Sequence, residues 1–395
     1  MTRIAACRGV AQRVVAIGAG AVVLSASGPA RAQRAAPRLA RLGTATGELS
    51  AELAGINSVR ELADGRVLVA SAFEPRLVVA NFRGQTVAPV SREGDGPGEY
   101  REVSRIHALA GDTTLVEDRR GPRWILLEGT HAVATLQTWT AGWRGPVVGG
   151  VDHRGRVLEV RPFRFGRSPG APAYQFFADA ESVTVLVHAA GTLTPDRGAR
   201  HGVDTIARLA GPWRGLSRGV RGTANGAPLG FELRCPLASS EQAVIFADGW
   251  IAIALHSPYR VDWVPPAGIR QSGKPLPFPE VRVDDLQKAN AMQVYEPAIT
   301  RAGFTPSELP GWPDVLPAFP NDALLAVPDG RLLIRRTSNA LVVGTFYDVV
   351  GRDGSLAGQR RLEANERIVG FGPNTVYVAV RADDDTELLR RYPWP

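Results

Sequence analysis

Arginine and aromatic side chains recur along this chain directly after short apolar runs, and they are the residues best suited to bind a ligand. A guanidinium offers a planar fork of N–H donors to a carboxylate, and an aromatic ring can stack on the face of another ring. The residues in such positions are Arg119, Arg120, Arg161, Arg164, His256, Tyr259, Arg335 and Arg336. If the fold gathers them, we expect a binding surface for an anionic or sugar-like ligand. The alternative is a solvated, charged rim that binds no ligand.

Catalytic motifs are scarce in the sequence. Residues 94–98, Gly-Asp-Gly-Pro-Gly, could cradle a phosphate, but the Lys-Ser/Thr pair of a P-loop is missing and no convincing helix follows. The loop therefore predicts a connector whose glycines adopt positive φ. The sequence has no His-x-x-x-His pair and no His-Glu-x-x-His pair. It predicts no catalytic residue, and no motif implies a cofactor.

The overall composition limits the class of partner. The chain has 395 residues, of which 44% are hydrophobic, so it can bury a large core. Its 46 basic residues outnumber its 39 acidic ones, but they are scattered among Asp and Glu and form no single stripe, so we expect no nucleic-acid partner. Cys235 is the single cysteine beyond the N-terminal segment, so no internal disulfide is expected in the mature chain.

The N-terminal segment has the pattern of a secretory signal peptide over residues 1–32. An arginine-rich start precedes an apolar stretch at 14–24, and Ala30-Arg31-Ala32 fits a small-residue cleavage site. An uncleaved membrane anchor is the alternative, although the stretch is shorter than the ~20 apolar residues that span a bilayer. We therefore expect a secreted or periplasmic protein without a transmembrane segment after cleavage.

Six short segments each combine a tight turn with a strand pattern that follows it. The turns lie at 64–65, 111–112, 154–155, 248–249, 329–330 and 372–374. Repetition of such units along one chain is typical of a β-propeller. We predict an all-β fold, a six-bladed β-propeller with four-stranded antiparallel blades. It would form a single domain over 41–395, after an unstructured leader at 33–40.

The spacing of the turns bears on the number of blades. Three intervals are 43–47 residues, close to one blade, whereas the other two, of 94 and 81 residues, are close to two blades each. Seven or eight blades are therefore the alternative. We favour insertions near 163–180 and 275–320, because the first is rich in Pro and Gly and residues 281–300 predict a short helix that Asp284 can cap. The last blade lacks a fourth strand, which the segment at 41–49 is predicted to supply, closing the ring.

A propeller would place the candidate ligand-binding residues on one face. The links between blades and the turns from second to third strands share the face opposite the Asp-Gly turns, so the eight residues named above would surround one mouth of the central channel. A lactonase-like hydrolase or lyase with a metal ion in the channel is the alternative function. If the protein has that function, the predicted inner strands offer Asn57 and Asp152, and few other side chains, as ligands for the metal ion.

The glycine-rich loop also resembles a known group of proteins. Residues 94–100, Gly-Asp-Gly-Pro-Gly-Glu-Tyr, resemble the inter-blade link of NHL-repeat propellers, and still more the G-x-G-P-G-E-[FY] loop of secreted bacterial six-bladed propellers. Residues 347–354 are similar to the late-blade pattern of the same group, and the likeness covers most of 50–392. It implies a six-bladed ring and a secreted or periplasmic location, and it carries over no catalytic residue. We therefore expect a ligand-binding or protein-interaction module in which no catalysis is evident.

Overall fold

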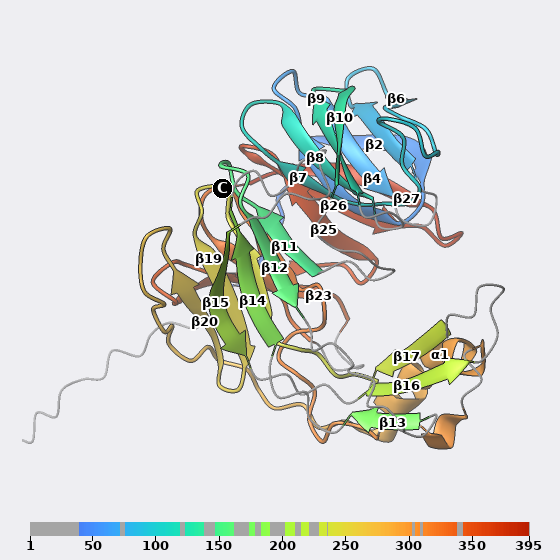
Figure 1. Ribbon diagram of the computed structural model, residues 1–395, viewed down its shortest axis with the longest axis vertical. Coiled ribbons are helices and arrows are strands. Elements are labelled where there is room, and N and C mark those ends of the chain that lie inside the picture. The colour runs from blue at the N-terminus through green and yellow to red at the C-terminus, as the bar shows by residue number, and fades with distance from the viewer. Residues whose placement is uncertain are drawn as a thin grey trace, which may run out of the picture. The chain divides into compact units, whose positions relative to one another are not determined.

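The strands of this protein form six antiparallel blades arranged as a ring, which confirms the predicted six-bladed β-propeller (Figure 1). The computed structural model describes residues 39–71, 76–118, 123–137, 147–161, 174–177, 183–189, 202–209, 215–220, 229–234, 236–301, 305–308, 311–337 and 343–394.

The first two blades each consist of four consecutive strands. Blade one contains β3 (Ile56–Glu61), β4 (Val67–Ser71), β5 (Arg76–Asn81) and β6 (Thr86–Pro89). Blade two contains β7 (Val103–Ala108), β8 (Thr113–Asp118), β9 (Arg123–Glu128) and β10 (His131–Gln137). In both blades each strand pairs antiparallel with the next one along the chain, from the inner strand outward.

The other blades vary this plan. Blade three contains β11 (Val147–Val151), β12 (Val157–Arg161), β14 (Val183–His188) and β15 (Val203–Leu209), and blade four contains β18 (Gln242–Ile245), β19 (Ile251–His256) and β20 (Tyr259–Val264). Blade five contains β21 (Leu324–Ala326), β22 (Leu332–Arg335), β23 (Thr345–Val350) and β24 (Leu356–Leu362), and blade six contains β25 (Glu366–Phe371), β26 (Thr375–Arg381) and β27 (Glu387–Pro393). At the outer edge of blade four, among the described residues, a single bridge joins Trp263 to Gln271 in place of a fourth strand.

Two long intervals between turns contain structure that belongs to no blade. In the first, β13 (Tyr174–Phe177), β16 (Gly215–Val220) and β17 (Leu229–Arg234) form a separate three-stranded sheet. The second contains α1 (Asp285–Arg301) and a single 3-10 turn, Pro306–Glu308. The carboxylate of Asp284 accepts the backbone N–H of Gln287 at 2.8 Å, and the Gln287 amide oxygen accepts the N–H of Asp284 at 2.9 Å. This reciprocal cap fixes the start of the predicted helix.

The N-terminal part of the chain closes the ring. Strand β2 (Gly47–Leu53) pairs antiparallel with β27 and forms the outer strand of blade six. Closure by an N-terminal strand is therefore confirmed, with pairing over 47–53 where 41–49 was expected. The short strand β1 (Leu39–Arg41) adds a parallel fifth strand to β24 of blade five. The two N-terminal strands, β1 and β2, thus occupy the edges of the neighbouring blades five and six.

The hydrophobic core lies between adjacent blades. Val59 of blade one packs in one cluster with Tyr377 of blade six, and Val261 of blade four packs with Ile334 of blade five. All five residues of β4 are buried, because both faces of a second strand contact a neighbouring blade. The second strands therefore show continuous apolar runs and not strict alternation. Each fully buried Val or Leu contributes about 1.5–3 kcal/mol to folding.

The Asp-Gly turns define one face of the ring. The Asp64 carboxylate accepts the backbone N–H of Arg66 at 2.9 Å, and Asp329 accepts that of Arg331 at the same distance. Gly65 and Gly330 adopt φ of 83° and 88°, which only glycine takes without strain. These turns end the inner strands, so the inner strands begin on the opposite face.

Inner strands carry β-bulges near that opposite face. The pairing register shifts between Ile56 and Ser58 in β3, and between Val103 and Ile106 in β7. Similar shifts occur in β11 and β25. A bulge bends the strand and redirects the side chain of the extra residue. In β7 one of the residues so affected is Arg105.

Candidate functional site

Four of the eight predicted ligand-binding residues have described side chains. Arg119, Arg120 and Arg164 lie outside the described residues, as does the side chain of Arg161 at the end of β12. The other four are His256, Tyr259, Arg335 and Arg336. They come from blades four and five, and they divide into three different environments.

Tyr259 and Arg336 meet at a buried carboxylate. The Tyr259 hydroxyl donates to Asp348 Oδ2 at 2.8 Å, and the side-chain amide of Gln359 donates to Oδ1 at 2.7 Å. Arg336 Nε lies 3.7 Å from the same carboxylate, which is fully buried. Burial raises the pKa of Asp348, and the Arg336 guanidinium opposes that shift. These contacts hold Tyr259 and Arg336 in the interface between blades four and five.

His256, at the end of β19, lies beside a second buried acid. Its backbone N–H donates to Glu241 Oε2 at 2.9 Å, and its ring stacks on Phe319 with centroids 3.8 Å apart. Burial lowers the pKa of His256 to about 4 and raises the pKa of Glu241 to about 7. Nε2 of the neutral ring lies 3.1 Å from the carbonyl of Ser240, to which it donates. Nδ1 is then the acceptor, and it meets no donor within the described part of the chain.

Arg335 belongs to a polar network at the start of blade five. Its Nη2 donates to the carbonyl of Asn321 at 3.1 Å. The Asn321 side chain accepts the Ser239 hydroxyl at 3.3 Å, and Gln242 accepts the N–H of Ala323 at 3.0 Å. The backbone around Asn321 and Asp322 is therefore held from blades four and five. Asp322 itself adopts a left-handed φ of 54°.

The same turn is reached from the far side of the ring. Arg105 of blade two pairs with Asp322 through Nη2 and Oδ1 at 2.6 Å, and its Nη1 donates to the carbonyl of Val148 in blade three at 3.1 Å. Blades two and five are opposite one another in a ring of six, so this ion pair crosses the ring axis. The side chain of Arg105 is 40% exposed and that of Asp322 is 68% exposed. We name Arg105, Ser239, Gln242, Asn321, Asp322 and Arg335 the axial cluster.

The sequence indicated Arg335 but missed Arg105. The residues predicted to bind a ligand lie at or near the ends of second strands, whereas Arg105 lies on an inner strand. The available signal was an arginine placed inside the strand pattern of Val103–Ala108. The partner, Asp322, lies 217 positions away and only the ring topology brings it close.

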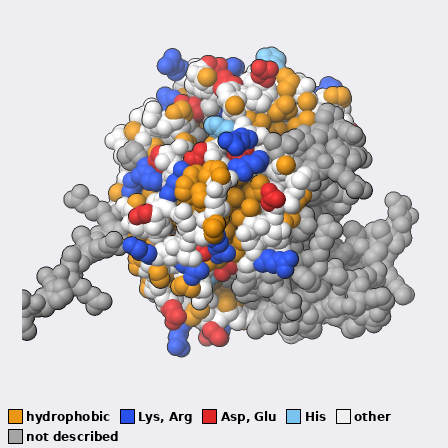
Figure 2. Space-filling view, turned by 60° about the vertical axis from the view of Figure 1, so that its left-hand side comes forward, with side chains coloured by type: hydrophobic (Ala, Val, Ile, Leu, Met, Phe, Trp, Pro, Cys, Tyr) orange, Lys and Arg blue, Asp and Glu red, His pale blue; other side chains and the backbone are white. Residues whose placement is uncertain are grey.

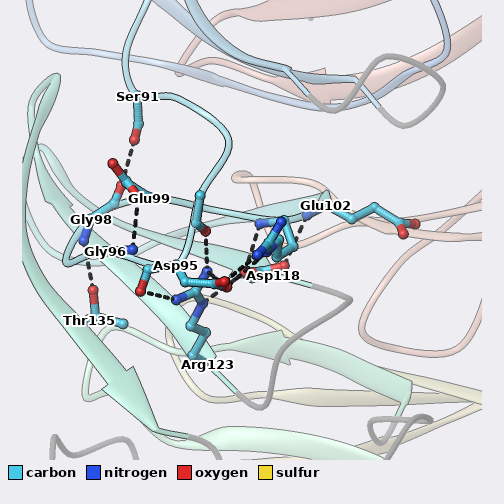
Figure 3. Close-up of polar contacts among 11 residues, drawn as sticks. Ser91, Asp95, Gly96, Gly98, Glu99, Glu102, Asp118, Arg123 and Thr135 are labelled. Atoms are coloured by element: carbon cyan, nitrogen blue, oxygen red, sulfur yellow. Dashed lines mark hydrogen bonds and ion pairs between the residues drawn. The ribbon is translucent and has the colours of Figure 1, made fainter.

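The glycine-rich loop is a connector whose polar groups bind one another (Figure 3). The N–H of Gly96 donates to Glu99 Oε2 at 2.8 Å, and the N–H of Gly98 donates to the Thr135 hydroxyl at 2.8 Å. Arg123 donates to the carbonyls of Gly94 and Asp95 at 2.6 and 2.9 Å. These contacts leave the loop without the array of outward N–H donors that a phosphate needs.

The expectation that all three glycines adopt positive φ is wrong for two of them. Gly98 has φ of 76°, but Gly94 and Gly96 do not have positive φ. A side chain at either of those two positions would instead run into the carboxylate of Glu99. The N–H of Gly96 and the Arg92 guanidinium lower the pKa of Glu99, so this carboxylate is charged. The loop thus uses glycine mainly to let Glu99 approach its backbone.

The two inner-strand candidates for metal ligands, Asn57 and Asp152, lie on opposite faces of the ring. Asn57 is near the start of β3, whereas Asp152 follows β11 and caps its turn. Asp152 accepts the N–H groups of Arg154 and Arg156 at 3.0 and 2.9 Å and pairs with the Arg156 side chain. In the described ranges, no three His, Cys, Asp or Glu side chains gather as metal ligands.

One side of the surface combines apolar and basic side chains. Figure 2 shows hydrophobic side chains gathered on one face, with Lys and Arg side chains near them. That face offers both apolar contact and positive charge. Where the structure describes the chain, none of its helices has the length and apolar character that a membrane crossing requires.

Comparison with known proteins yields likeness in structure only. A "putative exported protein" from Bacteroides fragilis matches 91% of this chain and 95% of its own, at 9% identity and a TM-score of 0.46. Virginiamycin B lyase from Staphylococcus aureus matches 87% of this chain and 97% of its own, at 8% identity and a TM-score of 0.41. No curated protein matches the sequence. No protein-family model matches it either, so the resemblance to NHL-repeat propellers stays a prediction.

Proposed function

We propose that this protein is an exported binding module that takes an anionic or sugar-like ligand at the axial cluster. The observation that carries the proposal is the ion pair between Arg105 and Asp322. It brings charged groups from opposite blades together at one end of the ring axis, where both remain accessible to solvent. Arg335, predicted from sequence, anchors the turn that presents Asp322.

The chemistry of the axial cluster suits a ligand with negative charge. A guanidinium has five N–H donors, and the contacts of Arg105 to Val148 and Asp322 use two of its nitrogens. The Ser239 hydroxyl and the Asn321 amide, which meet from blades four and five, match the hydroxyl groups of a sugar. The cluster contains no activated nucleophile with an adjacent base, and for that reason we propose binding and not catalysis.

Export is part of this proposal and is supported by the sequence. Residues 1–32 combine a basic start, a short apolar stretch and a small-residue cleavage site. The mature chain would then begin at Gln33 and include both N-terminal strands, β1 and β2.

A calorimetric titration of the mature chain with D-glucuronate tests the proposed binding. We expect D-glucuronate to bind and D-glucose, which lacks the carboxylate, to bind more weakly. Arg335→Gln should weaken D-glucuronate binding roughly tenfold, because hydrogen bonds to charged groups contribute about 1.5–3 kcal/mol. Arg336 is unsuitable for this test because it faces the buried Asp348.

Arg66→Gln is the matched control for Arg335→Gln. Arg66 is an arginine of the opposite face and pairs with Asp64 in an exposed turn. Its substitution should leave the affinity for D-glucuronate unchanged. Equal affinity for the two sugars, or no binding of D-glucuronate, would contradict the proposal.

A further inference from the structure

We propose that the ion pair between Arg105 and Asp322 is a carboxylate-exchange site. In the free protein the Asp322 carboxylate is paired with the Arg105 guanidinium. When a ligand binds, its carboxylate takes the place of the Asp322 carboxylate. The inference rests on the proposed function and deepens it, because it names the ligand group and the internal competitor. It also predicts that removal of an acidic residue strengthens binding, an outcome that a purely structural ion pair does not give.

Arg105 is held in place independently of Asp322. It lies within the bulge of β7, where the register shifts between Val103 and Ile106. The bulge turns its side chain away from the regular strand direction. The carbonyl of Val148 accepts Nη1 at 3.1 Å and fixes one side of the guanidinium. The cation therefore remains at the axis when the Asp322 carboxylate leaves.

The Asp322 carboxylate is free to leave, although its backbone is not. Its side chain is 68% exposed, and within the described residues its carboxylate contacts Arg105 alone. The adjacent backbone is fixed by Arg335 on one side and by Gln242 on the other. Asp322 also adopts a left-handed φ of 54°, a conformation that needs support from its surroundings. A rigid turn thus presents an acid that a rotation about its side-chain bonds can withdraw.

Other arginine–carboxylate pairs on this face are built differently. Asp118, which pairs with Arg123 at 3.0 Å, is buried and also accepts two backbone N–H groups. Glu387, which pairs with Arg367 at 2.7 Å, is 8% exposed and accepts the N–H of Ile56 at 2.6 Å. A ligand cannot replace these acids without leaving backbone donors unpaired. In the described part of the chain no backbone N–H donates to the Asp322 carboxylate, so its displacement leaves no such donor unpaired.

Titration of three variants with D-glucuronate at low salt tests the exchange. Asp322→Asn removes the competing charge and should tighten binding about two- to fivefold, the range expected from an exposed ion pair. Arg105→Gln removes the cation and should weaken binding at least tenfold. Asp248→Asn is the matched control, because Asp248 is 52% exposed and pairs with Arg352 on the opposite face. Its affinity should equal that of the unchanged chain.

The outcomes separate this inference from the proposed function. If Arg335→Gln weakens binding but Asp322→Asn leaves it unchanged or weaker, the exchange is wrong and the binding module stands. Unchanged affinity in Arg105→Gln would overturn the exchange in the same way. If D-glucuronate binds to neither the unchanged chain nor Asp322→Asn, both proposals fail. Thermal unfolding of each variant checks that the ring is intact, as expected for substitutions at exposed side chains.

Discussion

Glu241 and His256 are buried neighbours whose pKa values are displaced in opposite directions by the same cause. Burial disfavours the charged form of each group, which raises the pKa of Glu241 to about 7 and lowers the pKa of His256 to about 4. In the unfolded chain the two groups titrate near 4.5 and 6.5. Between those pH values the folded protein keeps the proton on Glu241 and leaves His256 neutral. The unfolded chain does the reverse.

The signs of the two contributions to stability follow from linkage. As pH rises from 4.5 to 7, only the folded state keeps the Glu241 proton, so this group lowers the free energy of unfolding. Between pH 4 and 6.5 the unfolded state keeps a His256 proton that the folded state has already lost, so this group raises the free energy of unfolding as pH rises. The two effects oppose each other between pH 4.5 and 6.5.

Glu241→Gln should expose the contribution of Glu241 to pH dependence. The amide keeps an oxygen for the N–H of His256 but does not titrate. We expect the stability of this variant relative to the unchanged chain to increase from pH 4.5 to pH 7, by up to about 3 kcal/mol. Urea unfolding at several pH values measures it, with Glu363→Gln, an exposed acid near Arg41, as control. If the stability difference between Glu241→Gln and the unchanged chain does not vary with pH, folding does not raise the pKa of Glu241.

At the scale of elements, the connector between blades one and two shows why glycine is needed at separate positions for separate reasons. Gly94 and Gly96 allow Glu99 to reach the loop backbone, whereas Gly98 supplies the left-handed turn. The Gly98 N–H then meets Thr135 on the outer strand of blade two. The connector therefore fixes the outer edge of one blade as well as the start of its inner strand.

Gly98→Ala should destabilise the protein by about 1–2 kcal/mol, the cost of a left-handed conformation for an L-residue. The added methyl group would also press on Ala132, because a Cβ atom placed at Gly98 lies 2.8 Å from the Cβ of Ala132. Gly43→Ala is the control, because no atom lies within 4 Å of a Cβ placed there. Urea unfolding of both variants measures the difference. Equal stability of the two variants would disprove the strain assigned to Gly98.

Local features of this fold were predictable, and long-range ones were less so. The Asp-Gly turns and the Asp284 cap depend on residues two or three positions apart, so their patterns are visible in the sequence. The closing strand was predicted, but it pairs over 47–53, because register is set by which leucines fit the core. Arg105 escaped detection because it meets Asp322 from a β-bulge, which the sequence does not display, and because the predicted site residues lay at the ends of other strands.

At the scale of the whole molecule, β1 and β2 add to the edges of two neighbouring blades, and they differ in what they bury. Leu49 and Leu53 of β2 are 1% and 2% exposed, within the core between blades one and six. Leu39 of β1 is 51% exposed. The seal of the ring therefore depends on β2, while β1 extends blade five at its surface.

Leu49→Ala should cost about 2–5 kcal/mol of stability, because it leaves a cavity at the closing strand. Leu39→Ala should change stability by less than about 0.5 kcal/mol, since the side chain is half exposed. Thermal and urea unfolding of both variants compare the two strands. A similar loss in both would mean that β1 contributes as much to closure as β2.

The pairing of β2 with β27 has a consequence for the timing of maturation. Glu48 and Arg390 form an ion pair across this seam although 342 positions separate them in the chain. Strand β2 leaves the ribosome long before β27 does, so a nascent chain cannot close the ring until β27 has emerged. Until then, β2 lacks the strand with which it seals blade six, and this delay keeps the chain short of its native state.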